Sequence, residues 1–513
     1  MVFTLLRLAL KAVFAALAVA IPLLAVWVAS SLAAYRNGPV WLACLCGLLL
    51  FPLLPLLWEG LGRWRTRRRR DLRARVLRSE SLRQPDGLTF TDRLILRTLI
   101  VSFVFLGALI FRWPQTTFAA LSTRGDWLLD GQGGPAAERA RRGLFTAADR
   151  LQWLYNALRD NEVEGLIDPK LEADPPVPKA SPAEPLPQRP PEPAPEPTKS
   201  EPTGTEPTAQ PKPEPPADRT ADGRPLWPLP ATLHPIVSDI PADVETSLES
   251  VARHIAANEP DRWLRIKALH DYVADRVAYD TVAYFSREMP PQDAVTVFNT
   301  RKGVCAGYAQ LLAAMGIAAG EEIVIVVGDA RTESSDLTGE GHAWNAAQID
   351  GAWYLIDPTW DAGHLDGQSF IKAYSTSNLF TPPSVFAVTH FPDEPRWQLQ
   401  DPPIARGDFF RQPVMRPEFF ASGLELVSPK RSQVDVDGPF DILINRPEGR
   451  YLLARYKTKD GVEGRCSVTH AATTTVHCPL PGPGTYDVDL FGGPVEFGTY
   501  NLVGQFEVHR AGS

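Results

Sequence analysis

Three residues far apart in the chain have the types and settings that covalent catalysis needs. Cys305 follows a glycine turn and lies at the start of a predicted buried helix over Gly303–Gly316. Backbone N–H groups and the positive end of the helix dipole favour a thiolate there, and the thiolate is the nucleophile. His342 starts one predicted strand, and Asp357 ends the next. The three types together predict a nucleophile, a base and a group that orients the base.

The stretch between His342 and Asp357 predicts the hairpin that would bring them together. Strands are expected over Ala343–Ile349 and Trp353–Ile356, and Asp350-Gly351 between them is a strong turn signal. Because adjacent antiparallel strands place residues opposite one another, His342 and Asp357 can be neighbours.

The surrounding pattern predicts an α+β domain over residues 236–400. Apolar residues at three and four spacing indicate amphipathic helices over Pro241–Asn258 and Asp261–Val277, and Ile323–Val327 is a further strand. Helices that precede a small antiparallel sheet are typical of this class. Trp263 is a candidate second hydrogen-bond donor to the oxyanion that forms in such a reaction. The favoured interpretation is that Trp263 is a core aromatic of its helix.

These motifs resemble the transglutaminase-like superfamily, which has a papain-like fold, and within it the kyphoscoliosis peptidase branch and its bacterial relatives. The resemblance covers about Ile236–Leu424. The matching stretches are Gly303–Ala309, Gly341–Asn345, Asp357–Gly363, His390–Pro392 and Trp397–Leu399. Tyr374–Ser377 departs from the aromatic-rich stretch expected of the family, so substrate specificity is not carried over.

The resemblance implies that Cys305 is the nucleophile, that His342 is the general base and then the acid, and that Asp357 orients His342. The implied reaction is acyl transfer from a peptide or protein amide through a thioester. Water as acceptor gives a peptidase or amidase, and an amine gives a cross-link. No cofactor and no metal ion are expected. The alternative is a catalytically silent scaffold that binds peptide or protein partners in the same cleft; retention of all three residues favours the enzyme.

Two other groups of residues invite a metal hypothesis. Asp361, His364 and Asp366 lie close together, but their spacing matches neither a zinc motif nor a calcium loop, so a solvated turn is expected. Cys466, His470, His477 and Cys478 form the second group.

In the second group, adjacent His477 and Cys478 would point to opposite faces of a strand, which spoils a tetrahedral zinc cage. Cys466 and Cys478 can instead oppose each other across a hairpin, and a disulfide is the preferred hypothesis if the domain is extracytoplasmic.

The region beyond Phe419 predicts a β-sandwich over residues 419–513. Short strands alternate with Gly and Pro turns, a spacing that fits a small sandwich. The expected strands are Leu424–Val427, Phe440–Ile444, Tyr451–Lys457, Cys466–Thr469, Thr474–His477, Gly484–Leu490 and Gly504–Val508.

The amino-terminal residues 1–113 predict a membrane region with about three transmembrane helices, over 12–34, 40–58 and 94–113. Between residues 60 and 83 lie ten arginines against two acidic residues, a local net charge of +8, whereas the whole chain of 513 residues carries −8. Basic loops beside spans stay in the cytoplasm, so spanning by the third segment would place the catalytic domain outside it. An acidic protein with one basic block excludes nucleic acid as the expected partner and leaves the lipid bilayer.

Two segments are expected to connect the membrane region to the catalytic domain. Residues 114–174 predict an amphipathic helical segment with a structural role. Residues 175–230 predict a disordered linker, because Pro175–Pro216 holds 17 prolines in 42 residues and cannot bury a core.

Overall fold

The computed structural model describes residues 2–36, 40–76, 89–129, 132, 134–151, 163–169, 171, 219–220, 223–333 and 339–511. Residues 172–218, which include most of the predicted linker, lie outside this set. The chain divides into two compact units. One holds Met1–Asp160 with Arg406–Phe410, and the other holds Asn161–Ala405 with Arg411–Ser513.

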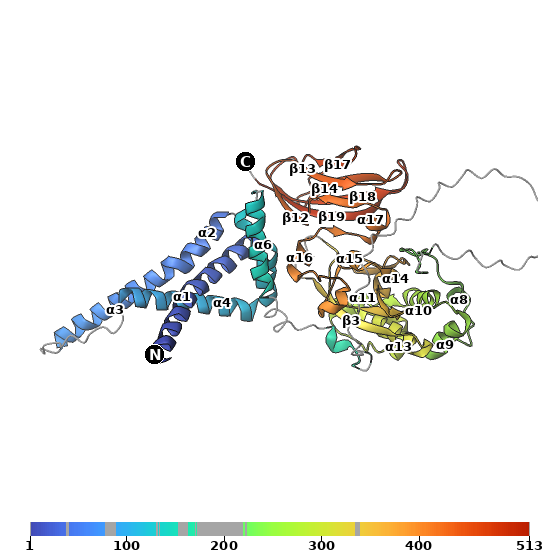
Figure 1. The fold of residues 1–513 in the computed structure, drawn as a ribbon, viewed down its shortest axis with the longest axis horizontal. Helices are drawn as coiled ribbons and strands as arrows, with labels where there is room; N and C mark the ends of the chain where they lie inside the picture. Colours follow the sequence, from blue (N-terminus) through green and yellow to red (C-terminus); the bar gives the residue numbers. More distant parts are fainter. Residues whose placement is uncertain are drawn as a thin grey trace, which may run out of the picture. The chain divides into compact units, whose positions relative to one another are not determined.

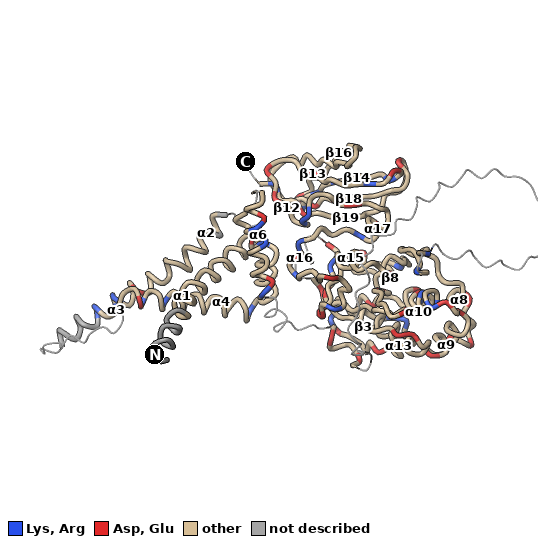
Figure 2. The backbone as a smooth tube through the Cα atoms, in the orientation of Figure 1, with Lys and Arg blue, Asp and Glu red and all other residues tan. Residues whose placement is uncertain are grey.

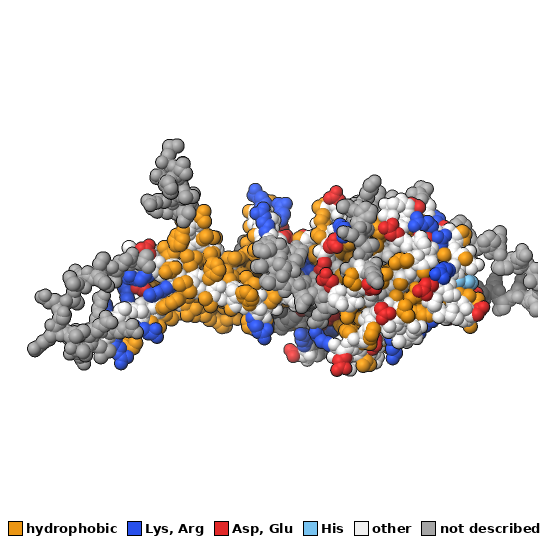
Figure 3. Space-filling model, turned by 90° about the horizontal axis from the view of Figure 1, so that it is seen from below, with side chains coloured by type: hydrophobic (Ala, Val, Ile, Leu, Met, Phe, Trp, Pro, Cys, Tyr) orange, Lys and Arg blue, Asp and Glu red, His pale blue; other side chains and the backbone are white. Residues whose placement is uncertain are grey.

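The first unit is helical (Figure 1). Figure 2 shows few charged residues along α1 and α2, and Figure 3 shows hydrophobic side chains over much of the surface of these helices on the face it draws. The helices are α1 (Val2–Tyr35), α2 (Val40–Leu48), α3 (Leu54–Val76), α4 (Phe90–Arg112), α5 (Pro114–Arg124) and α6 (Pro135–Asp149).

Three helical segments of this unit are long and apolar enough to cross a membrane: Val13–Tyr35, Cys44–Arg68 and Phe90–Arg112. The second continues past the expected end at residue 58, because α3 runs on through the arginine-rich stretch as one helix. The third begins earlier than expected, since Thr89 and Asp92 form a capping box at the start of α4.

The residues 114–174, expected to form one amphipathic helical segment, form several separate helical elements among those that the structure describes. The helix α6 ends at Asp149, and residues 152–162 lie outside the described set. Residues 163–171 belong to the second unit.

The second unit holds a five-stranded sheet in the order β8-β5-β4-β3-β9, with every neighbouring pair antiparallel. The predicted hairpin is confirmed, with Asp350 and Gly351 at φ 51° and 82°. The strands are β3 (Ile323–Ala330), β4 (Glu340–Ile349), β5 (Ala352–Ile356), β8 (Leu379–Thr381) and β9 (His390–Pro392).

The helix α13 (Cys305–Ala319) is the centre of this domain. It packs against α9 (Leu248–Asn258) and α10 (Arg262–Arg276), and against β3 and β4 of the sheet. Gly320, in the left-handed region at φ 76°, ends it. Gly307 allows close packing of its first turn, because a Cβ there would lie 2.7 Å from Oε1 of Gln292.

The predicted helix over Pro241–Asn258 is wrong in its first half. The helix begins at Leu248, because the Ser247 side chain accepts a hydrogen bond from the N–H of Ser250 and caps it. Residues 241–247 form turns instead.

The carboxyl-terminal domain has the predicted sandwich architecture, with two sheets in the orders β10-β19-β18-β14-β15 and β11-β13-β17-β16 and β12 added to β19. Strands β10, β12 and β15 were not predicted. The bounds are β10 (Val414–Met415), β11 (Glu425–Ser428), β12 (Gln433–Val436), β13 (Phe440–Asn445), β14 (Tyr451–Thr458), β15 (Glu463–Arg465), β16 (Ser467–Thr469), β17 (Thr474–Cys478), β18 (Gly484–Gly493) and β19 (Asn501–Arg510).

The predicted disulfide between Cys466 and Cys478 is formed, with 4.3 Å between the two Cα atoms. His477 is half-buried, and its Nδ1 lies 2.6 Å from Oδ1 of Asp441. The disulfide therefore accounts for both cysteines, and His477 takes part in a surface contact.

Candidate active site

The start of α13 places Cys305 in a nearly enclosed position. Only 5% of the residue is exposed. Val304, the residue before it, is extended and donates its N–H to Oε1 of Gln292 at 2.9 Å. This contact fixes the path of the chain into the helix, so the position of the thiol is set by buried backbone.

His342 and Asp357 are direct partners. Nε2 of His342, on β4, lies 2.8 Å from Oδ2 of Asp357. Asp357 follows β5 and caps the short helix α14 (Pro358–Ala362), with its Oδ1 accepting the N–H groups of Thr359 at 2.9 Å and Trp360 at 3.2 Å. The cap holds one carboxylate oxygen, which leaves Oδ2 directed at the imidazole.

A second histidine, which sequence reasoning gave no role, shares the same carboxylate oxygen. Nε2 of His390, on β9, lies 3.1 Å from Oδ2 of Asp357, and its Nδ1 lies 3.0 Å from the Thr389 hydroxyl. Asp357 therefore has four hydrogen-bond partners, two on each oxygen, which fills the usual capacity of a carboxylate. The only sign of His390 in the sequence was its place in the matching stretch His390–Pro392.

The electrostatics favour a charged pair. Burial lowers the pKa of His342, but the charge of Asp357 and hydrogen bonds with Asp357 and Cys305 outweigh it and raise that pKa to about 10. Burial raises the pKa of Asp357, but His342 and His390 hold it well below its usual range. For His390, burial prevails and lowers the pKa, so this imidazole is neutral at pH 7.

Aromatic side chains enclose these groups. The Trp360 ring centroid lies 4.4 Å from that of His390 and 5.6 Å from that of His342. Just before α13, β1 (Ala278–Tyr279) pairs with β2 (Lys302–Gly303) and puts Tyr279 opposite Gly303. Burial raises the pKa of Tyr279, and the charge of a Cys305 thiolate raises it further.

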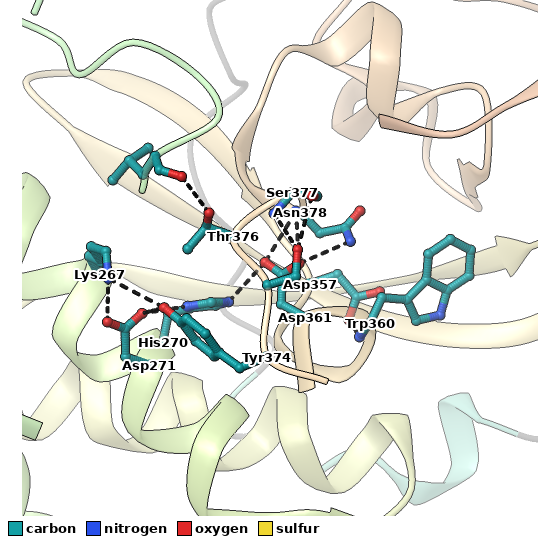
Figure 4. A network of polar contacts seen from close by, with 12 residues as sticks. Lys267, His270, Asp271, Asp357, Trp360, Asp361, Tyr374, Thr376, Ser377 and Asn378 are labelled. Atoms are coloured by element: carbon teal, nitrogen blue, oxygen red, sulfur yellow. Dashed lines mark hydrogen bonds and ion pairs between the residues drawn. The ribbon is translucent and has the colours of Figure 1, made fainter. Parts of the chain in front are cut away.

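A second buried histidine network joins α10 to Asp361 of α14 (Figure 4). Nδ1 of His270 lies 3.1 Å from Oδ1 of Asp271, and Nε2 lies 3.1 Å from Oδ2 of Asp361. Lys267 forms an ion pair with Asp271, and the Tyr374 hydroxyl donates to Asp271 at 2.6 Å. Burial lowers the pKa of His270, but both carboxylates outweigh it and raise that pKa to about 9.

This network corrects the expected solvated turn at Asp361, His364 and Asp366. His364 and Asp366 are exposed, whereas Asp361 is fully buried and accepts the backbone N–H of Asn378 at 3.0 Å. Asp361 therefore does not share a site with the other two.

Within the described residues, the one group of potential metal ligands is His342, Asp357 and His390, whose ligand atoms lie within 4.8 Å of one another. Hydrogen bonds of 2.8 and 3.1 Å already join both imidazoles to the carboxylate.

Trp263, the candidate second donor to an oxyanion, is only 8% exposed. Its ring centroid lies 4.6 Å from that of Tyr354 in an edge-on arrangement, so Trp263 is a core aromatic.

The comparisons with known proteins agree with this fold. Residues 249–358 match the family model of the transglutaminase-like superfamily, and residues 406–512 match that of the KY-like, immunoglobulin-like domain. Mouse kyphoscoliosis peptidase is 29% identical over 220 residues, which cover 41% of this chain and 31% of that protein.

Two further proteins have a lower sequence identity to this chain. The Lim and transglutaminase domain protein ltd-1 of Caenorhabditis elegans is 27% identical over 311 residues, 51% of this chain and 43% of its own. A solved structure of a TGase has 22% sequence identity and a TM-score of 0.20, and covers 26% of this chain and 34% of its own. The chain thus spans less than half the length of these curated relatives. It carries a domain of the transglutaminase-like superfamily, and its similarity within that superfamily is to the kyphoscoliosis peptidase branch.

Proposed function

We propose that the protein is a membrane-anchored cysteine enzyme that acts on peptide or protein amide bonds by acyl transfer. The observation that carries the proposal is the buried pair of His342 and a fully partnered Asp357, with Cys305 at the start of α13 near enough to help raise the pKa of His342. A cysteine at a helix start beside an oriented imidazole is the arrangement that thiol acyl transfer requires.

In this mechanism the Cys305 thiolate attacks the carbonyl carbon of the amide and forms a tetrahedral intermediate. Because Nε2 of His342 is held by Asp357, charged His342 gives its Nδ1 proton to the leaving nitrogen as the C–N bond breaks, which leaves a thioester on Cys305. Neutral His342 then takes a proton from the acceptor as it attacks the thioester. Water yields an acid, an amine yields a new amide, and in both cases the thiolate and the imidazolium are restored.

Asp357 acts on His342 alone in this scheme. Its negative charge stabilises the imidazolium, and its capped position keeps the ring directed. The raised pKa of His342, about 10, means that the imidazole is charged at neutral pH before the thiolate attacks, so the first proton transfer has its donor in place.

The proposal is tested with casein as probe substrate and cadaverine as probe amine. The full-length protein should release new peptide termini or attach cadaverine to glutamine side chains, and Cys305→Ser should do neither. Mass spectrometry distinguishes the two products. Absence of both products in a preparation whose Cys305 still reacts with iodoacetamide would contradict the enzyme and favour a peptide-binding scaffold.

We further propose that the catalytic domain lies outside the cytoplasm. Three segments long enough to span, with the arginine-rich stretch between the second and the third, support this orientation. The Cys466–Cys478 disulfide also supports it, because disulfides persist in oxidising compartments. Protease added to intact cells should cleave the stretch Pro175–Pro216. Cleavage only after lysis would place the catalytic domain in the cytoplasm and contradict the proposed orientation.

A further inference from the structure

A short segment from before the proline-rich stretch lies against the catalytic domain. Its described residues are 163–169 and 171, and it includes the turn η3 (Glu164–Leu166), drawn in teal near β3 in Figure 1. Ile167 is only 6% exposed and belongs to one apolar cluster with Val304, Ala306 and Ala343. Val304 and Ala306 flank Cys305, and Ala343 follows His342, so the segment packs beside the proposed catalytic residues.

One buried side chain binds the backbone of this segment. Gln310, 1% exposed and five residues after Cys305 on α13, accepts the N–H of Asp168 at 2.9 Å through Oε1. Its Nε2 donates to the carbonyl oxygen of Leu166 at 3.1 Å, and also to that of Gln292 at 2.8 Å. The amide therefore binds the backbone on both sides of Ile167, as a neighbouring strand would.

This arrangement recognises features that many peptides share. The two backbone hydrogen bonds carry no sequence requirement, and the apolar cluster accepts one aliphatic side chain between them. If the segment left, the buried amide of Gln310 would lose two partners, which is costly unless another peptide or water replaces them. The surface is thus built to be occupied by a peptide backbone.

We propose that this surface is a peptide-docking subsite of the enzyme, and that residues 163–171 fill it in cis as a substrate-like segment that limits access to Cys305. The inference rests on the proposed function and adds the substrate class: a peptide with an aliphatic residue between two free backbone groups. The 5% and 7% exposure of Cys305 and His342 is consistent with the occupied state.

The chain connectivity allows the segment to leave without disturbing the domain. The stretch Pro175–Pro216, with 17 prolines in 42 residues, lies between it and the rest of the second unit. A chain of this many residues can span at most about 3.3–3.6 Å per residue. The segment can therefore dissociate while it stays tethered at a high local concentration.

The test compares two variants of the full-length protein in detergent. Ile167→Asp puts a carboxylate into the apolar cluster, whereas Gly165→Asp puts the same group at an exposed position with open space around it. We expect Ile167→Asp to raise the rate of Cys305 alkylation by iodoacetamide about tenfold or more, the factor in occupancy that burial of one aliphatic side chain supplies. Gly165→Asp should stay within about twofold of the native rate.

A peptide added in trans completes the test. The peptide of residues 163–171 should bind the Ile167→Asp protein, measured by fluorescence anisotropy, and should restore protection of Cys305; the same peptide with Asp for Ile should do neither. Ile167→Ala, a milder change, should raise the alkylation rate in the same direction. Equal rates in all variants and no peptide binding, with Cys305 reactive, would overturn the subsite and leave the proposed function intact. Peptide binding to a protein whose Cys305 is inert would support the subsite and refute the enzyme.

Discussion

The two buried histidine networks, which contact α14 at Asp357 and Asp361, differ in one decisive respect. Asp357 caps α14, Asp361 lies one turn later on that helix, and each bonds a buried histidine. Cys305 contributes to the raised pKa of His342, whereas the side-chain hydrogen bonds of His270 within the described residues go to carboxylates, and His270 is completely buried.

Both networks raise the pKa of their histidine, to about 10 for His342 and about 9 for His270. A shifted histidine therefore does not by itself mark a catalytic site. The thiol at a helix start distinguishes the first network, so the proposed catalysis concerns the first network, and we expect the second to contribute to stability.

The largest effect that we expect is on the pH dependence of stability. Both histidines have folded-state pKa values above the usual 6.5, so the stabilisation they give is complete below pH 6.5 and is lost as pH rises through about 9 and 10. The free energy of unfolding should fall by several kcal/mol over this range, at about 1.4 kcal/mol for each unit of pKa shift. Urea titrations followed by tryptophan fluorescence would measure it, and in His342→Ala the fall should end near pH 9. A flat profile would contradict both assignments.

Asp361→Ala should destabilise the catalytic domain by about 3–5 kcal/mol, because it leaves His270 buried without one of its two carboxylates. Urea unfolding at pH 6 measures the change. Asp366→Ala, at an exposed position four residues from the end of α14, is the matched control and should stay within about 0.5 kcal/mol. A similar small effect for Asp361→Ala would mean that the second network does not hold the domain together.

His342→Ala should slow alkylation of Cys305 at pH 6 by about 100-fold, the lower end of what a positioned acid or base supplies. The exposed His364→Ala serves as control and should react like the native protein. Intact-mass spectrometry gives both rates. If the two variants reacted alike, the imidazole would have no part in activating the thiol.

His390 offers a smaller and more selective effect. His390→Leu removes one hydrogen bond from Oδ2 of Asp357 and should slow alkylation at pH 6 by about tenfold, the low end for a bond to a charged group. His390→Gln can keep a donor at that position and should recover most of the rate. The pH profile distinguishes the two roles: a positioning residue shifts it, whereas one that only fills space lowers the melting temperature and leaves the profile in place.

The sequence predicted the parts of the site that local patterns encode. A glycine turn before a buried helix located Cys305, and Asp350-Gly351 located the hairpin that joins His342 to Asp357. These features depend on short-range turn and helix chemistry, which a single sequence displays directly.

The remaining partners depend on contacts between distant stretches. His390 reaches Asp357 because β9 pairs with β3, opposite Ala330, sixty residues earlier. Asp361 contacts His270, which is 91 residues earlier in the sequence. The spacing of Asp361 to His364 suggested a solvated turn, because a sequence pattern does not reveal which of these side chains is buried. Ile167 was assigned to a helical segment, and nothing local indicates its contact with Gln310.

The most direct test of the proposed catalytic site is the pH profile of Cys305 alkylation by iodoacetamide from pH 5.5 to 9, in the native protein and in urea. The charge that His342 keeps throughout this range, with a pKa of about 10, predicts a native rate that changes little between pH 6 and 8. In urea the alkylation rate should rise steeply as the pH approaches about 8.5, the pKa of an ordinary cysteine. Two parallel profiles would show that Cys305 is not coupled to His342 and would contradict the proposed enzyme.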